Sequence, residues 1–418
     1  MRLQPLLVSL ALAVLILVGL FVLKRNSSNS VVVPPAPGPI TINHPPRDFE
    51  PVWENLDAYQ NTITAARLQE MIETVYAVGD TWKEVINIEP EQATIQTDKG
   101  SYVLKLLPEG AEMPQEVKRY WNDGPLQGLH IAIDPGHIGG DFAGIEERQF
   151  GFPEDKPVRE GEMTLQTAKR LKPMLEEMGA KVSLVRSTNE PVTKTRTKDY
   201  LQMYRSVNPG VPDGLLMPYA TRRFYRRAEI VERARVVNEE LKPDMVLCLH
   251  YNASSGSGAW SNPSSPVLVD ENHYHMLMNG AYTSGEVLDE GDRFQMIERI
   301  LQRIHEQEAA VAKVVAEIFV EETALPPYEY DPNSSRAKNV GGDPYLWARN
   351  LLANRSYTCP VLYFEPYVMN NIEVYARIQA GDYDGVKEVA GKERPSIMRE
   401  YAEAVAKGIK EYYSGGAE

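Results

Sequence analysis

Four side chains that can bind a metal ion or transfer a proton stand at the ends of predicted secondary structure elements: His137, Glu160, His250 and Glu365. His137 lies in a Pro-Gly turn directly after an apolar run, His250 and Glu365 each end another apolar run, and Glu160 stands at the start of an amphipathic stretch. Two neutral imidazoles and one carboxylate make a three-ligand set that leaves zinc a fourth position for water. A second carboxylate can take the proton of that water, so these residue types are typical of metal-assisted hydrolysis.

The elements that must position these residues follow a pattern from Leu129 onward, in which short apolar runs alternate with longer amphipathic ones. This pattern predicts an α/β domain with a mainly parallel twisted sheet and helices on both faces. Ligands of such sheets bind beyond the carboxyl ends of the strands, so the four side chains are expected to meet at one edge. We expect strands at Leu129–Asp134, Lys181–Val185, Met245–His250 and Val361–Glu365, and helices at Glu162–Met178, Ala228–Leu241, about Phe294 to Glu322 and about Pro395 to Tyr412.

A membrane-spanning segment is predicted at the amino terminus. Residues 6–23 form a run of eighteen residues without charge, which at about 1.5 Å per residue is just long enough to cross a bilayer core. A signal peptide usually has an apolar region of roughly 7–15 residues and a small-residue cleavage site, whereas Lys24, Arg25 and Asn26 follow this run. We therefore expect residues 1–25 to be a single-pass membrane anchor. A cleaved signal peptide, which would give a secreted protein, is the alternative.

Two further segments precede the α/β region. Residues 26–52 change from Ser, Asn and Val to a proline-rich composition and are predicted to form an extended linker. Residues 53–112 are predicted to form a small α+β module of unknown role, with a helix over Leu56–Tyr76 and a hairpin turn at Thr97–Gly100 between the stretches Trp82–Gln96 and Ser101–Leu107. Residues 113–418 are then expected to form the catalytic domain.

The composition argues against a protein that binds nucleic acid and against a metal site made of cysteines. The chain of 418 residues has 58 acidic and 44 basic side chains and a net charge of -14, whereas a protein that binds nucleic acid needs a basic surface. Its two cysteines, Cys248 and Cys359, are too few for a thiolate zinc site and are expected to be buried thiols.

His273 and His275 suggest a second pair of metal ligands. Because they stand on a predicted loop, we expect them to be solvent-exposed instead.

Residues 129 to about 412 resemble the zinc-dependent N-acetylmuramoyl-L-alanine amidases, which cut peptidoglycan. The resemblance rests on four motifs in the order and the strand or helix context of the family: Asp134-Pro135-Gly136-His137 followed by Gly139-Gly140, Glu160 five residues before Leu165, Arg233 and Asn238 before His250 and Asn252, and Glu365 before Asn370. The resemblance implies that His137, Glu160 and His250 bind Zn2+, and that Glu365 acts as general base and then as general acid.

The resemblance also implies a substrate and a location. The bond cut would be the amide between the lactyl group of muramic acid and L-alanine in peptidoglycan. Because peptidoglycan lies outside the cytoplasmic membrane, the amino terminus would be inside and the catalytic domain would face the periplasm or the cell wall. The sequence identifies no activating partner.

Some positions depart from the family pattern. Gly161 stands where the family commonly has lysine, Tyr251 replaces a small residue, and Phe364 and Pro366 flank Glu365 unusually. Two stretches, Ser187–Tyr225 and Ser254–Gly291, are longer than the family core. Two alternatives therefore stay open beside the amidase. One is a wall-binding or scaffold protein with weakened catalysis, and the other is a zinc peptidase that cuts another amide of the stem peptide.

Overall fold

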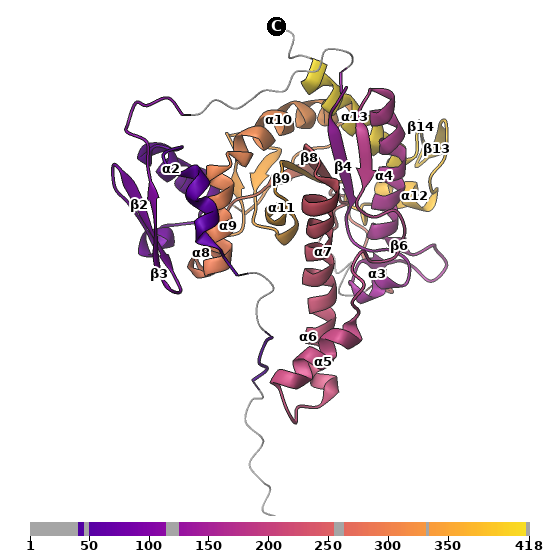
Figure 1. Cartoon of the computed structure of the whole chain (residues 1–418). Coiled ribbons are helices and arrows are strands. Elements are labelled where there is room, and N and C mark those ends of the chain that lie inside the picture. The colour runs from indigo at the N-terminus through magenta and orange to yellow at the C-terminus, as the bar shows by residue number, and fades with distance from the viewer. Residues whose placement is uncertain (1–40, 46–49, 114–124, 255–262, 332–333, 415–418) are drawn as a thin grey trace, which may run out of the picture. The chain divides into compact units, whose positions relative to one another are not determined.

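The computed structural model describes residues 41–45, 50–113, 125–254, 263–331 and 334–414. A sheet runs through the α/β region, and its strands β9, β8 and β4 are labelled in Figure 1. It has seven strands in the order β10-β11-β9-β12-β8-β4-β7. Its strands are β4 (His130–Pro135), β7 (Lys181–Leu184), β8 (Met245–Leu249), β9 (Tyr274–Met278), β10 (Lys338–Asn339), β11 (Leu346–Ala348) and β12 (Val361–Pro366). The four predicted strands correspond to β4, β7, β8 and β12, and they form the parallel part of the sheet.

The other half of the sheet changes direction. β9 is antiparallel to β12, β11 is parallel to β9, and β10 is antiparallel to β11. The sheet is therefore mixed and mostly parallel, and these three strands were not predicted. β10 and β11 are very short, and β9 carries a histidine within an otherwise apolar run, which hides its strand pattern.

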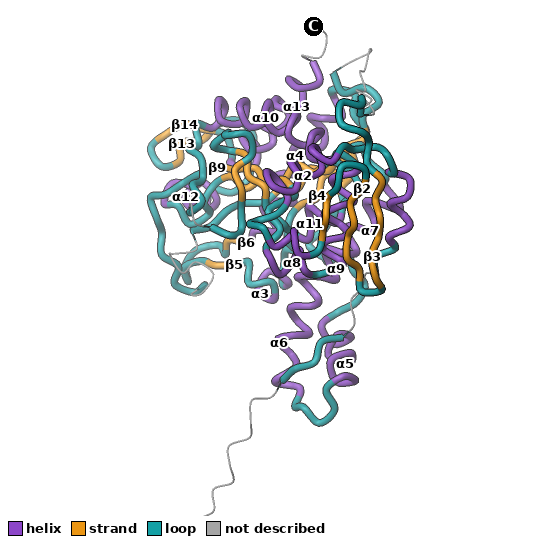
Figure 2. The backbone as a smooth tube through the Cα atoms, turned by 90° about the vertical axis from the view of Figure 1, so that its left-hand side faces the viewer, coloured by secondary structure: helices purple, strands orange, loops and turns teal. Residues whose placement is uncertain are grey.

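Helices cover both faces of the sheet, as predicted. Successive residues of β4 point to opposite faces, so that Ile131 and Ile133 belong to the larger core and Ala132 to the smaller one. Among the helices that cover the larger core are α4 (Glu160–Glu177), α10 (Ile304–Thr323) and α13 (Ile397–Ser414), of which α13 packs against both others (Figure 2). The smaller core is covered by α7 (Glu229–Arg235), which directly follows η4 (Phe224–Ala228) and continues into η5 (Val236–Leu241).

The prediction of one long helix from about Phe294 to Glu322 is wrong, because the structure has two helices in this region. α9 (Glu290–Leu301) ends before Arg303, whose backbone has a left-handed φ of 55°, and α10 begins at Ile304. A left-handed conformation costs a non-glycine residue about 1–2 kcal/mol. Since neither glycine nor proline marks this break, it follows from the packing of the two helices and has no local signal.

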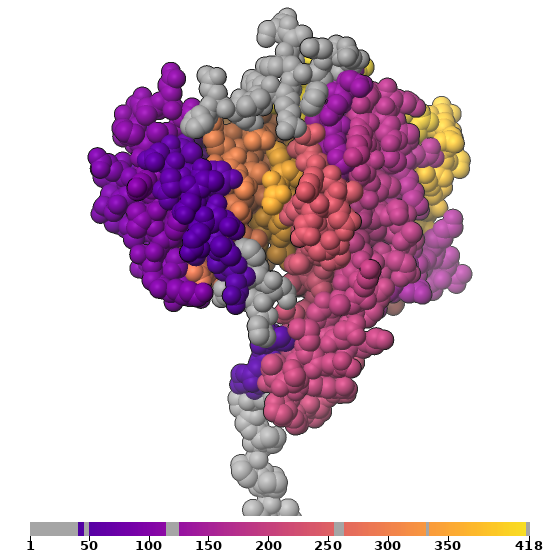
Figure 3. Space-filling view, in the orientation of Figure 1, coloured from indigo at the N-terminus to yellow at the C-terminus, as the bar shows by residue number. Residues whose placement is uncertain are grey.

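The remaining elements of the α/β region are short. The helices are α3 (Phe142–Ile145), α5 (Thr197–Val207), α6 (Asp213–Arg223), α8 (Ser284–Leu288), α11 (Leu352–Ser356) and α12 (Ile372–Gln379), and two small sheets pair β5 (Gln149–Phe150) with β6 (Val158–Arg159) and β13 (Lys387–Val389) with β14 (Lys392–Arg394). The insertion predicted at Ser187–Tyr225 contains α5 and α6, which pack together as a hairpin that extends away from the sheet (Figures 1 and 3).

The module before the α/β region contains η1 (Trp53–Tyr59), α2 (Ala65–Met71), η2 (Ile72–Tyr76), η3 (Thr81–Glu84), β1 (Ile86–Ile88), β2 (Gln92–Thr97) and β3 (Gly100–Lys105). The hairpin turn at Thr97–Gly100 is confirmed. The continuous helix over Leu56–Tyr76 is wrong, because the 3-10 helix η1 ends at Tyr59 and α2 begins only at Ala65. The Thr64 side chain caps α2 by accepting from the Arg67 amide. The stretch Trp82–Gln96 is likewise divided, between η3, β1 and β2.

The predicted membrane anchor lies outside the described residues, as does most of the predicted linker. Within residues 41–45, 50–113, 125–254, 263–331 and 334–414, no helix combines the length and the apolar composition that a bilayer crossing needs.

Candidate metal centre

Three of the predicted site residues meet where β4, β8 and α4 come together. Glu160, the first residue of α4, holds both imidazoles: its Oε2 lies 3.2 Å from Nε2 of His137, and its Oε1 lies 3.1 Å from Nδ1 of His250. One ligand atom from each residue can be chosen so that all three atoms lie within 4.8 Å of one another. Glu160 and His250 are buried, whereas His137 is about one-fifth exposed and leaves the group open to solvent on one side.

Two glycines permit this close approach. An added Cβ on Gly136 would come within 2.3 Å of the His250 ring, and one on Gly161 would come within 1.9 Å of the carbonyl oxygen of Ile138. A side chain at either position would therefore push the His137 turn away from His250 or from the start of α4. This explains the departure from the family pattern at Gly161, since lysine cannot fit there.

A buried arginine fixes the turn that carries His137. Arg233 on α7 donates to Oδ1 of Asp134 at 2.9 Å, to the carbonyl of Pro135 at 2.8 Å and to the carbonyl of His137 at 2.6 Å. The other carboxylate oxygen of Asp134 accepts from the Tyr357 hydroxyl. Asp134 therefore stabilises the turn, in agreement with the absence of this residue from the metal group found among the described side chains.

Glu146, a residue that the sequence did not single out, supports His137 from behind. It is buried, its Oε2 accepts from the Ile138 amide at 2.6 Å, and its Oε1 lies 3.7 Å from Nδ1 of His137. A carboxylate on the outer nitrogen of a histidine orients the ring and directs its other nitrogen towards a metal. Glu146 lies in the loop after the Gly139-Gly140 turn, where a single glutamate gives no pattern by which it could be found.

The charges of the three residues reinforce one another. Burial alone would raise the pKa of Glu160, but the His137 and His250 imidazoles outweigh it and hold this pKa far below its usual range. Burial likewise opposes the charged form of His137, yet Glu160 and Glu146 raise its pKa to about 9. Burial lowers the pKa of His250. In the metal-free protein the ionised Glu160 carboxylate is thus paired with a protonated His137, and burial favours the neutral form of His250.

Glu365, the fourth predicted residue, lies on the same face of the sheet, at the end of β12. Tyr363, two residues earlier on that face, stacks on His250 with ring centroids 4.4 Å apart and an angle of 12° between the planes. Glu365 keeps part of its surface exposed. Burial of its carboxyl group and the charge of Glu160 raise its pKa to about 8. A carboxyl group with a pKa near neutrality is suited to proton transfer.

The asparagines of the predicted motifs hold loops in place. Asn370 accepts from the Ser254 amide at 2.9 Å and donates to the Val267 carbonyl at 3.0 Å. Asn238 donates to the Ser356 carbonyl at 2.8 Å and accepts from the Thr358 amide at 3.0 Å. These contacts join segments that are distant in the sequence, close to the strands that carry the site.

The expectation that His273 and His275 are exposed on a loop is wrong. His275 lies within β9 and His273 directly before it, and both are buried. Burial lowers the pKa of His273 to about 4 and holds that of His275 well below its usual value. The two cysteines are free thiols, Cys248 buried and Cys359 only partly so.

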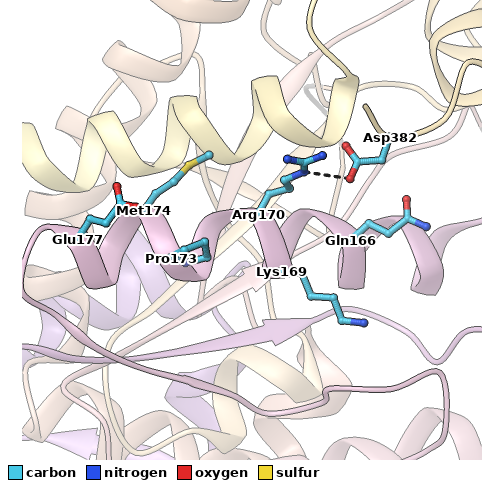
Figure 4. Close-up of a pocket in the computed structure, with 7 residues that line it drawn as sticks. All are labelled: Gln166, Lys169, Arg170, Pro173, Met174, Glu177 and Asp382. Atoms are coloured by element: carbon cyan, nitrogen blue, oxygen red, sulfur yellow. Dashed lines mark hydrogen bonds and ion pairs between the residues drawn. The ribbon is translucent and has the colours of Figure 1, made fainter. Parts of the chain in front are cut away.

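One hollow of the described surface lies away from this site. It has a volume of about 520 Å³ and runs along the outer side of α4, where Arg170 forms an ion pair with Asp382 at 3.0 Å (Figure 4). Its lining consists of Gln166, Lys169, Arg170, Pro173, Met174, Glu177 and Asp382, and contains none of the four predicted site residues.

The donor set of His137, Glu160 and His250 fits zinc. Two imidazole nitrogens and one carboxylate oxygen are the ligands of many catalytic zinc sites, which keep a fourth position open. The partial exposure of His137 supplies the open side, and Glu146 supplies the outer carboxylate.

The mixed α/β fold and this group of two histidines and a glutamate define a hydrolase with a possible metal site. The family model of the N-acetylmuramoyl-L-alanine amidases matches residues 131–411. The chain therefore belongs to the N-acetylmuramoyl-L-alanine amidase family, and it is an amidase that acts on peptidoglycan. A search of curated proteins gives no match.

Several solved amidase structures match this chain at low sequence identity. The apo form of Ami1 from Mycobacterium abscessus is 15% identical, with 69% of this chain and 99% of that chain covered and a TM-score of 0.39. The catalytic domain of CwlV from Bacillus (Paenibacillus) polymyxa var. colistinus is 17% identical, with 68% and 98% covered and a TM-score of 0.36. The CwlD amidase from Clostridioides difficile, solved in complex with the GerS lipoprotein, is 13% identical, with 69% and 100% covered and a TM-score of 0.40.

Proposed function

We propose that this N-acetylmuramoyl-L-alanine amidase depends on zinc bound by His137, Glu160 and His250, and that Glu365 transfers the proton during hydrolysis. The observation that supports the proposal most strongly is the convergence of three ligand atoms within 4.8 Å, from three elements of the fold. The bond cut is the amide between the lactyl group of muramic acid and L-alanine.

Each residue has a separate task in this reaction. When bound, zinc supplies a Lewis acid that polarises the scissile carbonyl and makes a water molecule easier to deprotonate. Glu146 and Arg233 keep the His137 turn in place, and Tyr363 fixes the plane of the His250 ring. The Glu365 carboxylate takes a proton from the attacking water and then donates it to the departing amine of L-alanine.

Product analysis tests the reaction. The zinc-loaded protein is incubated with purified peptidoglycan, and the released groups are identified by mass spectrometry. We expect free lactyl ends on muramic acid and stem peptides with a free L-alanine amine. Stem peptides cut internally would assign the protein to the zinc peptidases, and a lack of any release at full zinc loading would favour a wall-binding protein.

We further infer that residues 1–25 anchor the protein in the cytoplasmic membrane, that residues 26–52 form the linker, and that residues 113–418 form a catalytic domain outside the cytoplasm. The uncharged run at residues 6–23 and the location of peptidoglycan support this arrangement. Protease added to cells with opened outer layers is expected to degrade the protein while a cytoplasmic control survives. A mature protein that begins near residues 26–35 and is recovered in the soluble fraction would show that the run is a signal peptide.

A further inference from the structure

A group of aromatic side chains and one arginine lies beside Glu365, on the part of the sheet that the sequence did not predict. We call it the β9 rim and define it as Tyr328, Tyr330, Trp347 and Arg349, all of which are partly exposed. The rim begins one strand away from the reactive carboxylate, because Glu365 of β12 is paired with His275 of β9. Residues paired in this way point to the same face of a sheet.

The buried ring of His275 connects the rim to this face. Tyr328 stacks on it with centroids 4.8 Å apart, and Tyr330 meets it edge-on at 5.7 Å. The Tyr330 hydroxyl lies 3.3 Å from Nε2 of His275, and the Tyr330 ring packs on Trp347 at 4.7 Å. The rings therefore have fixed positions, and they extend from β9 to β11.

Arg349 follows β11 and supplies the only positive charge of the rim. Its guanidinium acts electrostatically on both the Tyr330 hydroxyl and the Glu365 carboxyl group. No carboxylate of the segments that we describe lies within ion-pair distance of Arg349. Arg233 and Arg299, in contrast, each form an ion pair of 2.8–2.9 Å with a buried glutamate. An arginine that lies beside the Tyr330 hydroxyl and lacks such a partner can accept an anion from solution.

We propose that Arg349, beside Tyr330 and with Trp347 packed behind that ring, binds the carboxylate of the stem-peptide residue that follows L-alanine in the substrate. This inference rests on the proposed function. Guanidinium and carboxylate groups form the strongest charge-assisted hydrogen bonds in proteins, and flanking aromatic rings exclude water that would weaken them. β11 lies two strands from β12, which separates the two strands by about 10 Å at roughly 4.8 Å per strand. The length of the Arg349 side chain covers part of this distance, so the distance that remains between its guanidinium and Glu365 matches the length of a dipeptide.

The test uses two zinc-loaded preparations of the full chain and two substrates. The substrates are muropeptides that differ only at the second stem residue, whose α-carboxyl group is either free or amidated. Wild type is expected to favour the free carboxylate by about tenfold or more in kcat/KM, the factor that one charge-assisted hydrogen bond gives. Arg349→Gln should raise KM for this substrate by a similar factor, keep kcat within about twofold, and leave the amidated substrate unaffected.

A matched control removes the same charge nearby. Arg336 is exposed and precedes β10 at the same edge of the sheet, so Arg336→Gln should leave both substrates unaffected. Arg349→Lys keeps the charge without the planar two-pronged donor, and a partial increase of KM for the free carboxylate alone is expected. If Arg349→Gln fails to fold, as judged by thermal unfolding, the KM values of Arg349→Lys for the two substrates test the proposal instead.

Two results would overturn the proposal. An equal loss of kcat on both substrates would mean that Arg349 acts on Glu365 and does not bind the peptide. Equal cleavage of the two substrates by wild type would mean that this carboxylate is not recognised. Both results differ from a failure of the proposed function, in which zinc-loaded wild type releases no lactyl ends from either substrate.

Discussion

Gly161 and Ile138 lie so close together that a methyl group on Gly161 would come within 1.9 Å of the Ile138 carbonyl oxygen. Because the obstacle is a backbone atom, it cannot move unless the turn that carries His137 moves with it. The contact therefore ties the start of α4, and with it Glu160, to His137.

We predict that Gly161→Ala separates these two ligands. The substitution should destabilise the fold by about 1–3 kcal/mol, the usual result of overpacking, and should lower both zinc content and amidase activity. Gly214→Ala in α6 is the control, since no atom lies within 4 Å of its added Cβ. Denaturant unfolding and elemental analysis measure the two effects. A Gly161→Ala protein with full zinc content and normal activity would contradict the role given to this contact.

The two carboxylates can be separated by their amide variants. Glu365→Gln should keep zinc but lower kcat by about 10²- to 10⁴-fold, because the amide preserves shape and cannot accept a proton. Glu160→Gln should lose both zinc and activity. Zinc content by elemental analysis and kcat on muropeptides are measured for each. Loss of zinc from the Glu365 variant alone would show that the two roles are exchanged.

Glu146 should matter for metal binding without touching the metal. In Glu146→Gln the side chain still accepts from the Ile138 amide but loses the charge beside Nδ1 of His137. Zinc affinity is expected to fall about 10- to 100-fold, measured by competition with a chelator of known affinity. Glu147→Gln removes the neighbouring charge, which is exposed and pairs only loosely with Arg226 at 3.8 Å, and should leave the affinity unchanged.

Stability should fall in mild acid because of buried neutral imidazoles. Burial lowers the pKa of His273 to about 4, whereas an unfolded histidine titrates near 6.5. The unfolded chain thus binds a proton first, so the stability that His273 contributes is complete above pH 6.5 and is lost as the pH falls towards 4. Between pH 7.5 and pH 5.5 this single residue should cost about 1.4 kcal/mol in the free energy of unfolding.

The variant His273→Gln removes this titration. Its free energy of unfolding should depend less steeply on pH than that of wild type, by the amount given above, and the curves should run parallel above pH 7. Denaturant titrations at four or five pH values measure both slopes. Identical slopes for the two proteins would mean that His273 is not buried as a neutral group.

The parallel strands and the places of the four side chains at the ends of strands and helices were predictable from the sequence because each signal is local. An apolar run that ends in His250 or Glu365 gives both the strand and the position of the side chain at its carboxyl end. The rest depends on contacts between distant segments. The burial of His275 in an antiparallel strand, the break of the helix at Arg303 and the support of His137 by Glu146 have no pattern of their own in the sequence.

The glycine at position 161 also depends on a contact that the sequence does not reveal. Nothing in the sequence explains glycine in place of a common lysine, whereas the structure gives a steric reason. A position can differ from a family pattern because its neighbour in space differs, and only coordinates reveal that neighbour.

The bridge that Glu160 makes between His137 and His250 has a consequence for how the protein takes up its metal. With a pKa of about 9, His137 carries a proton at neutral pH in the metal-free protein, and the Glu160 carboxylate is the counterion of this charged imidazole. A divalent cation that enters must expel it, so loading acidifies a weakly buffered solution and becomes more favourable with each step towards alkaline pH. The occupancy of this enzyme is therefore tied to the acidity of its compartment.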